Sequence, residues 1–236
     1  MTIKENLASI CSTIQAAAQR ANRDPALIRL VAVSKQMPTE AVGEAMQCGQ
    51  PLFGENYLQE AAEKIAAVPH GARWHFIGHL QSNKARQAAE LFDMVETVDR
   101  LKIARALDRH AQQIGKTLPI LVQVNVGRDP RKAGVLPEDA PELLRTIAKE
   151  TRLPVHGLMT MPPFTDDPEQ SRPYFKALKE LAKQLADKGL FADNNHVELS
   201  MGMSADYPVA IEEGATLVRV GTALFGTRST KGAPVL

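Results

Sequence analysis

Lys35 is the residue of this sequence whose type and position best suit covalent chemistry. It follows the apolar run Leu30-Val31-Ala32-Val33-Ser34 and precedes a helix opening at Pro38-Thr39-Glu40. An amine at the end of a buried strand is partly desolvated, which lowers its pKa and suits it to form a Schiff base with an aldehyde. A lysine that merely extends from a strand end into solvent fits the same pattern and is the commoner case. Lys35 alone therefore does not decide between the two interpretations.

Two glycine turns near the C-terminus have the composition of an anion site. Ser200-Met201-Gly202-Met203-Ser204 leads into a helical segment at 205–213, so its backbone amides lie at a helix start. Gly221-Thr222 ends the apolar run 217–220 and offers further amides and a hydroxyl. Glycines that only permit turns would explain either segment equally well. If both turns follow the last two strands of a barrel, they lie where barrels commonly hold phosphate.

Arg219 adds a buried positive charge to these groups. Period-two alternation places Leu217, Arg219 and Gly221 on one face of a strand. An arginine inside a barrel needs an acceptor, and a carboxylate such as Glu198 or a pyridine nitrogen would serve. An aldehyde-reactive lysine, a phosphate cradle and a cation able to meet a ring nitrogen together describe a site for pyridoxal 5'-phosphate.

The elements that must position these residues alternate regularly along the chain. Longer helical patterns separate the runs with β-rich composition, and this order predicts parallel strands joined by helical crossovers. Eight such units predict a single (β/α)8 TIM barrel, an α/β fold, whereas an open doubly wound sheet remains an alternative. The candidate strands are residues 30–34, 52–53, 73–77, 94–98, 120–126, 155–159, 196–199 and 217–220.

One domain is expected to span residues 1–236, with an extra N-terminal helix over 3–21 and the barrel over 30–228. The helix is predicted from apolar residues at helical spacing, namely Ile3, Leu7, Ile10 and Ile14. With 44% apolar residues, a chain of 236 residues can bury a large core.

The composition excludes several classes of partner. The 28 Lys and Arg balance 27 Asp and Glu, so we expect a small ligand and no binding to nucleic acid. Cys11 and Cys48 form no CxxC pair, which argues against a disulfide scaffold or zinc knuckle. His75 and His79 lie in a strand-like pattern, so we expect no metal site. No apolar run approaches 18 residues and no leader pattern opens the chain, so a cytoplasmic location without membrane insertion is expected.

The sequence resembles the YggS/PROSC family of pyridoxal phosphate homeostasis proteins, whose fold is that of the alanine racemase barrel. The resemblance covers residues 30 to 228 and follows the order of the family's motifs. The six motifs are Ala32-Val33-Ser34-Lys35, Phe53-Gly54-Glu55-Asn56-Tyr57, Trp74-His75-Phe76-Ile77-Gly78-His79-Leu80-Gln81-Ser82-Asn83-Lys84, His156-Gly157-Leu158-Met159-Thr160-Met161, Ser200-Met201-Gly202-Met203-Ser204 and Arg219-Val220-Gly221-Thr222-Ala223-Leu224-Phe225-Gly226.

This resemblance implies a role for each candidate residue. Lys35 would form the internal aldimine with pyridoxal 5'-phosphate, Arg219 would hydrogen-bond the pyridine nitrogen, and Asn56 would lie at the rim of the pocket. Because arginine does not readily release a proton, the cofactor would be a weaker electron sink than one paired with aspartate. The phosphate would be held by hydroxyls and backbone amides after the last two strands: Ser200, Met203, Ser204, Gly221 and Thr222.

Three functions are compatible with such a site. The resemblance favours a protein without efficient turnover, expected to be a monomer, that buffers the cofactor or delivers it to apoenzymes. The alternative is a small racemase that uses the same lysine. Related racemases take their second base from an additional β-domain and a partner subunit, and we expect no such domain, because only about 14 residues follow Thr222. An unrelated aldolase using Lys35 is the third possibility.

Overall fold

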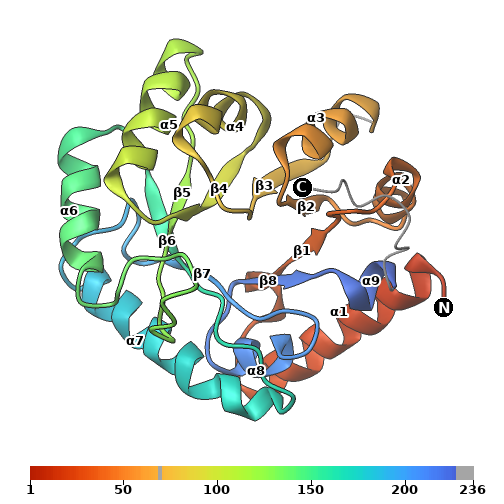
Figure 1. Cartoon of the computed structure of the whole chain (residues 1–236). Coiled ribbons are helices and arrows are strands. Elements are labelled where there is room, and N and C mark those ends of the chain that lie inside the picture. The colour runs from red at the N-terminus through yellow and green to blue at the C-terminus, as the bar shows by residue number, and fades with distance from the viewer. Residues whose placement is uncertain (69–70, 227–236) are drawn as a thin grey trace.

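Eight parallel strands alternate with helices and close into a barrel in the computed structural model of the chain (Figure 1). The structure describes residues 1–68 and 71–226, so the expected end of the barrel at 228 lies outside the described residues. Each strand pairs with the next along the chain, and the last strand pairs with the first. The predicted (β/α)8 barrel is therefore confirmed, and the alternative of an open sheet is excluded.

The strands are short and are buried along most of their length, as expected for the inner wall of a barrel covered by helices. They are β1 Arg29–Val33, β2 Leu52–Glu55, β3 Arg73–Phe76, β4 Met94–Val98, β5 Ile120–Gln123, β6 Val155–Met159, β7 Glu198–Ser200 and β8 Leu217–Val220. The α-helices are α1 Ile3–Arg20, α2 Thr39–Gln47, α3 Leu58–Ala67, α4 Ala85–Leu91, α5 Leu101–Gln113, α6 Ala140–Glu150, α7 Arg172–Ala186, α8 Tyr207–Glu212 and α9 Thr222–Phe225.

Several strands begin or end one to three residues away from their predicted bounds, and one helix was not predicted. The fifth strand was expected to run to residue 126 but ends at Gln123, because the next residues turn to pair with the backbone of Val135. The short helix α9 was not predicted, and it begins at Thr222 directly after Gly221. Gly221 and Thr222 thus belong to the junction between a strand and a helix.

The predicted N-terminal helix is present as α1, and it packs against α8 and α9 outside the barrel (Figure 1). A capping box starts it, in which Thr2 Oγ1 accepts from Glu5 N at 3.2 Å and Glu5 Oε2 accepts from Thr2 N at 2.8 Å. Asn6 Nδ2 donates to Leu224 O at 2.8 Å. The helix therefore fixes the position of α9 and of the strand end that precedes it.

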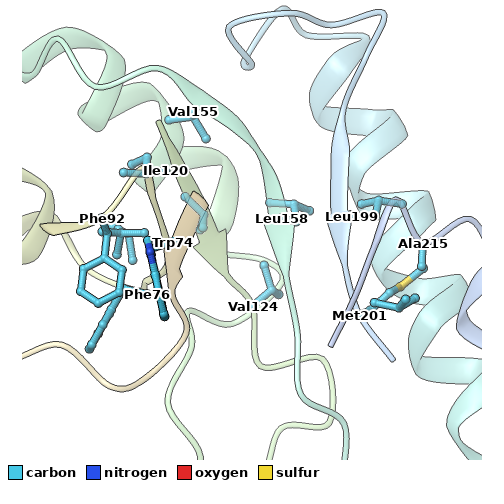
Figure 2. Close-up of a cluster of buried hydrophobic side chains, with 14 of the residues drawn as sticks. Trp74, Phe76, Phe92, Ile120, Val124, Val155, Leu158, Leu199, Met201 and Ala215 are labelled. Atoms are coloured by element: carbon cyan, nitrogen blue, oxygen red, sulfur yellow. The ribbon is translucent and has the colours of Figure 1, made fainter. Parts of the chain in front are cut away.

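Apolar side chains fill two regions on either side of the barrel wall. Figure 2 shows part of the larger one, in which Phe76 and Phe92 meet edge to face at 5.2 Å between ring centroids. The smaller region forms an apolar layer inside the barrel, made of Val31, Leu52, Met94, Leu121, Met159 and Leu217. None of the helices in the described ranges is both long and apolar enough to cross a membrane.

Gly157 is a position where the barrel wall admits no side chain. A Cβ there would lie 1.9 Å from Glu198 O on the neighbouring strand β7. We expect Gly157→Ala to lower the free energy of unfolding by about 1–3 kcal/mol, because the strands must move apart. Gly43→Ala is the control, since a Cβ there meets nothing within 4 Å and alanine stabilises a helix by up to about 1 kcal/mol relative to glycine. Urea unfolding of both variants gives the comparison, and equal stabilities would contradict the packing.

Candidate functional site

A cavity of about 300 Å³ lies at the C-terminal ends of the strands. Its volume falls at the lower end of the range for small-molecule sites. The residues around it come from β1 and β8 and from the segments that follow β1, β2, β3, β6, β7 and β8. They are Val33, Lys35, Asn56, Ile77, Met161, Pro163, Phe164, Thr165, Met203, Ser204, Ala205, Asp206, Arg219, Gly221 and Thr222.

Lys35 borders this cavity from the turn after β1, where it is half-buried. The backbone is held on both sides of it. Ser34 O accepts from Lys64 Nζ at 2.6 Å, and Gln36 N donates to Glu60 Oε1 at 2.5 Å. The turn therefore presents Lys35 to the cavity from a fixed backbone.

A buried ion pair between Lys64 and Glu55 supports that turn. Lys64 Nζ lies 2.7 Å from Glu55 Oε1, which also accepts from Ser34 Oγ at 2.7 Å. The side chains are 3% and 0% exposed. Burial raises the pKa of Glu55, and the Lys64 and Ser34 hydrogen bonds oppose that shift. Sequence reasoning did not predict this pair, because its members lie on β2 and α3 with no recognisable spacing.

Asn56 offers a buried acceptor to the cavity. Among the described residues, its Oδ1 is one of two buried side-chain polar atoms without a hydrogen-bond partner; the other is Glu55 Oε2. Gly78 approaches so closely that a Cβ on it would lie 2.2 Å from Asn56 O. The backbone of Asn56 is thus held in place, while its amide oxygen is available to a donor on a ligand.

Hydrogen-bond donors also border the cavity from the segments that follow β7 and β8. The amides of Gly221 and Ala223 point to Ser204 Oγ at 3.3 and 3.4 Å, and Thr222 adds an exposed hydroxyl. The contacts to Ser204 are long for N–H···O hydrogen bonds, so the amides have capacity for a stronger acceptor. This set of donors suits a phosphate group.

The Met203 amide is engaged differently from the sequence-based expectation. It donates to Asp206 Oδ1 at 2.7 Å, so a carboxylate of the chain already satisfies the donor that was assigned to the phosphate. Asp206 is buried and borders the cavity. Sequence reasoning missed this residue, although an aspartate just before a helix start is a frequent partner of backbone amides.

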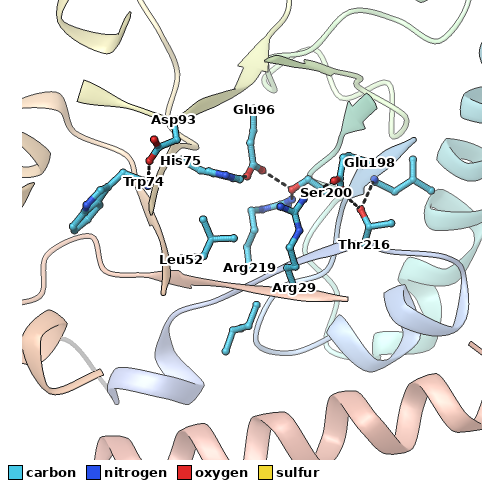
Figure 3. A network of polar contacts seen from close by, with 12 residues as sticks. Arg29, Leu52, Trp74, His75, Asp93, Glu96, Glu198, Ser200, Thr216 and Arg219 are labelled. Atoms are coloured by element: carbon cyan, nitrogen blue, oxygen red, sulfur yellow. Dashed lines mark hydrogen bonds and ion pairs between the residues drawn. The ribbon is translucent and has the colours of Figure 1, made fainter. Parts of the chain in front are cut away.

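Arg219 enters the cavity from inside the barrel and is only 4% exposed. Its Nη1 donates to Ser200 Oγ at 2.6 Å (Figure 3). Its Nη2 donates to Thr160 O at 2.8 Å. The prediction that Glu198 is the carboxylate partner of Arg219 is wrong. Glu198 instead accepts from Arg29 at 2.5 Å. It lies two residues before Ser200 on β7, nearer the N-terminal ends of the strands.

Of the eight predicted site residues, only Ser200 does not line the cavity. Its hydroxyl is fully buried in the barrel, where it also donates to Glu96 Oε2 at 2.5 Å. Glu96 and its partner His75 were not predicted. The indication in the sequence was a carboxylate in the middle of the apolar run Met94-Val95-Glu96-Thr97-Val98. In the described ranges no cluster of three or more His, Cys, Asp or Glu is placed to hold a metal ion.

The barrel and its cavity define a (β/α)8 protein with a small-molecule site at the C-terminal mouth of the strands. Residues 6–229 match the alanine racemase N-terminal domain family. The pyridoxal phosphate homeostasis protein of Pseudomonas aeruginosa is 47% identical over 236 residues, covering 99% of this chain and 98% of the relative. That of Escherichia coli K12 is 42% identical over 231 residues, covering 96% and 97%.

A solved structure of a similar protein supports the same family relationship. PipY of Synechococcus elongatus, solved with PLP bound, has 37% identity and a TM-score of 0.81, covering 95% of this chain and 100% of that one. The chain belongs to the pyridoxal phosphate homeostasis protein family. The resemblance seen in the six sequence motifs is thereby confirmed.

Proposed function

We propose that this protein binds pyridoxal 5'-phosphate covalently through Lys35 and serves in intracellular vitamin B6 homeostasis, by buffering the cofactor or delivering it to apoenzymes. The proposal is supported chiefly by the single cavity that Lys35 borders together with the donors of Ser204, Gly221 and Thr222. The homologues' name and the PLP-bound PipY structure support it.

The residues around the cavity fit this cofactor. Pyridoxal phosphate, when bound, would supply an aldehyde able to condense with the Lys35 amine. Gly221 lets the end of β8 pack closely against β1, since a Cβ there would lie 3.2 Å from Val33 O. Asn56 Oδ1 provides a buried acceptor, and Arg219 provides donors on the side of the ring. Val33 and Ile77 give the cavity apolar walls.

The charge of Arg219 favours a carrier over an enzyme. Catalysis at the α-carbon of amino acids benefits from a protonated ring nitrogen, which draws electrons from the reacting bond. A guanidinium donates a hydrogen bond but keeps its proton, so a ring nitrogen held by Arg219 would stay unprotonated. The proposal accordingly includes no efficient turnover. It also includes a cytoplasmic location and a monomer made of one domain.

The test is to load the purified protein with pyridoxal phosphate and to offer it L- and D-alanine in deuterated solvent. We expect cofactor exchange with the amino acids but neither racemisation nor α-proton exchange at about 1 per second, the lower end of ordinary enzyme rates. In a second arm the loaded protein is mixed with a pyridoxal phosphate-dependent apoenzyme, whose activity should be restored. Racemisation at enzymatic rates would favour the alternative of a small racemase.

A further inference from the structure

A layer of polar side chains separates the apolar layer of the barrel from the cavity. It consists of His75, Glu96, Ser200 and Arg219, which come from β3, β4, β7 and β8 (Figure 3). None is more than 4% exposed. On β4 and β8 the polar residue follows the apolar one by two positions, as Glu96 follows Met94 and Arg219 follows Leu217. Alternation along each strand therefore stacks the polar layer on the apolar one.

The hydrogen bonds of this layer determine which atom donates and which accepts in each contact. An ionised Glu96 only accepts, so His75 Nδ1 donates to Oε1 at 2.7 Å and Ser200 Oγ donates to Oε2 at 2.5 Å. The single hydroxyl proton of Ser200 is thereby used. Its oxygen accepts from Arg219 Nη1 at 2.6 Å. Ser200 thus has no second proton with which to donate to a phosphate group.

The charges of the layer support the same arrangement. Burial by itself would raise the pKa of Glu96, but the hydrogen bond and charge of His75, the charge of Arg219 and the Ser200 hydrogen bond outweigh it and leave this pKa below its usual value. Burial lowers the pKa of Arg219, whereas the charges of Glu96 and Asp206 raise it. A buried positive charge is costly unless a negative group compensates it. Glu96 provides this compensation through the Ser200 hydroxyl.

We infer that Ser200 and Glu96 are positioning residues for Arg219, with the Ser200 hydroxyl linking the carboxylate to the guanidinium, and that Ser200 is not a ligand of the phosphate. The inference rests on the proposed function, because it concerns the side of the site that faces the cofactor ring. It also changes the role that family resemblance implied for Ser200.

Two ligands show whether Ser200 acts on the phosphate or on the ring side of the site. They are pyridoxal 5'-phosphate and pyridoxal, which lacks the phosphate. Occupancy of Lys35 is measured by borohydride reduction and mass spectrometry over a range of concentrations. We expect Ser200→Ala to weaken both ligands by the same factor, about tenfold for one lost charge-assisted hydrogen bond. The absorption maximum of the bound chromophore should shift as well. Ser204→Ala, at the phosphate end, should weaken pyridoxal phosphate alone.

Two further variants distinguish an effect on binding from an effect on folding. Glu96→Gln preserves size and should reproduce the pattern of Ser200→Ala, while Ser200→Thr keeps the hydroxyl and should restore affinity and spectrum. Thermal unfolding without ligand checks that each variant is folded. Loss of pyridoxal phosphate affinity in Ser200→Ala with unchanged pyridoxal affinity would make Ser200 a phosphate ligand and overturn the inference, as would no change for either ligand. A wild-type protein that binds neither ligand would overturn the proposed function itself.

Discussion

Lys35→Ala is expected to abolish covalent uptake of pyridoxal phosphate while leaving the fold intact. Lys35 is half-buried at the mouth of the barrel and contributes to no strand or helix, so its removal leaves the apolar core unchanged. Without its amine no lysine is placed at the cavity to bond the aldehyde, since Lys35 is the only lysine among the described residues that line it. The visible absorption of the bound cofactor should disappear.

A matched control for Lys35→Ala is Lys84→Ala. Lys84 is exposed in a turn after β3 and does not line the cavity. This variant should keep the full absorption band, and both variants should unfold at the temperature of the wild-type protein. A Lys35→Ala protein that retained the band would show that another amine carries the cofactor.

The second large effect is expected from Lys64→Met. The substitution keeps an apolar stem but leaves Glu55, which is 0% exposed, without its cationic partner. Breaking a buried ion pair by removing one member costs about 3–5 kcal/mol. The loss also releases the backbone at Ser34, whose carbonyl accepts from Lys64. We therefore expect lower stability in urea unfolding and weaker cofactor attachment at Lys35.

The destabilisation by Lys64→Met should depend on pH in a defined direction. Burial already raises the pKa of Glu55, and without Lys64 this pKa rises further. A carboxyl whose pKa is higher in the folded than in the unfolded state stabilises the fold at low pH, and this contribution is lost as the pH rises through the folded-state pKa. The variant should therefore lose more stability at about pH 8 than at about pH 5. Adding Glu55→Gln to Lys64→Met should remove most of that difference, and an equal loss at both values would contradict the buried charge.

The barrel could be predicted from the sequence because its signals are local. Each strand is a short β-rich run, and each lies before a helical segment with its own apolar periodicity. Lys35, Asn56, Gly221 and Thr222 were predictable for the same reason, since each follows the end of such a run and the topology of parallel strands brings these ends together. The family motifs then assigned them roles.

The polar interior was not predictable in this way. The partner of Arg219 depends on the stagger of neighbouring strands, which decides whether Glu198 or Ser200 meets the guanidinium, and no residue pattern within one strand encodes it. Glu96 acts across the barrel from Ser200, 104 positions away in the chain. The pair of Glu55 and Lys64 likewise joins a strand to the face of a helix. These contacts depend on three-dimensional packing of side chains.

Peptide mapping is the decisive test of whether Lys35 holds pyridoxal phosphate covalently. The wild-type protein is saturated with pyridoxal phosphate, reduced with borohydride and digested, and the modified peptide is sequenced by mass spectrometry. We expect one pyridoxyl group per chain, carried by the Lys35 peptide. An unmodified protein, or a pyridoxyl group predominantly on another lysine, would contradict it.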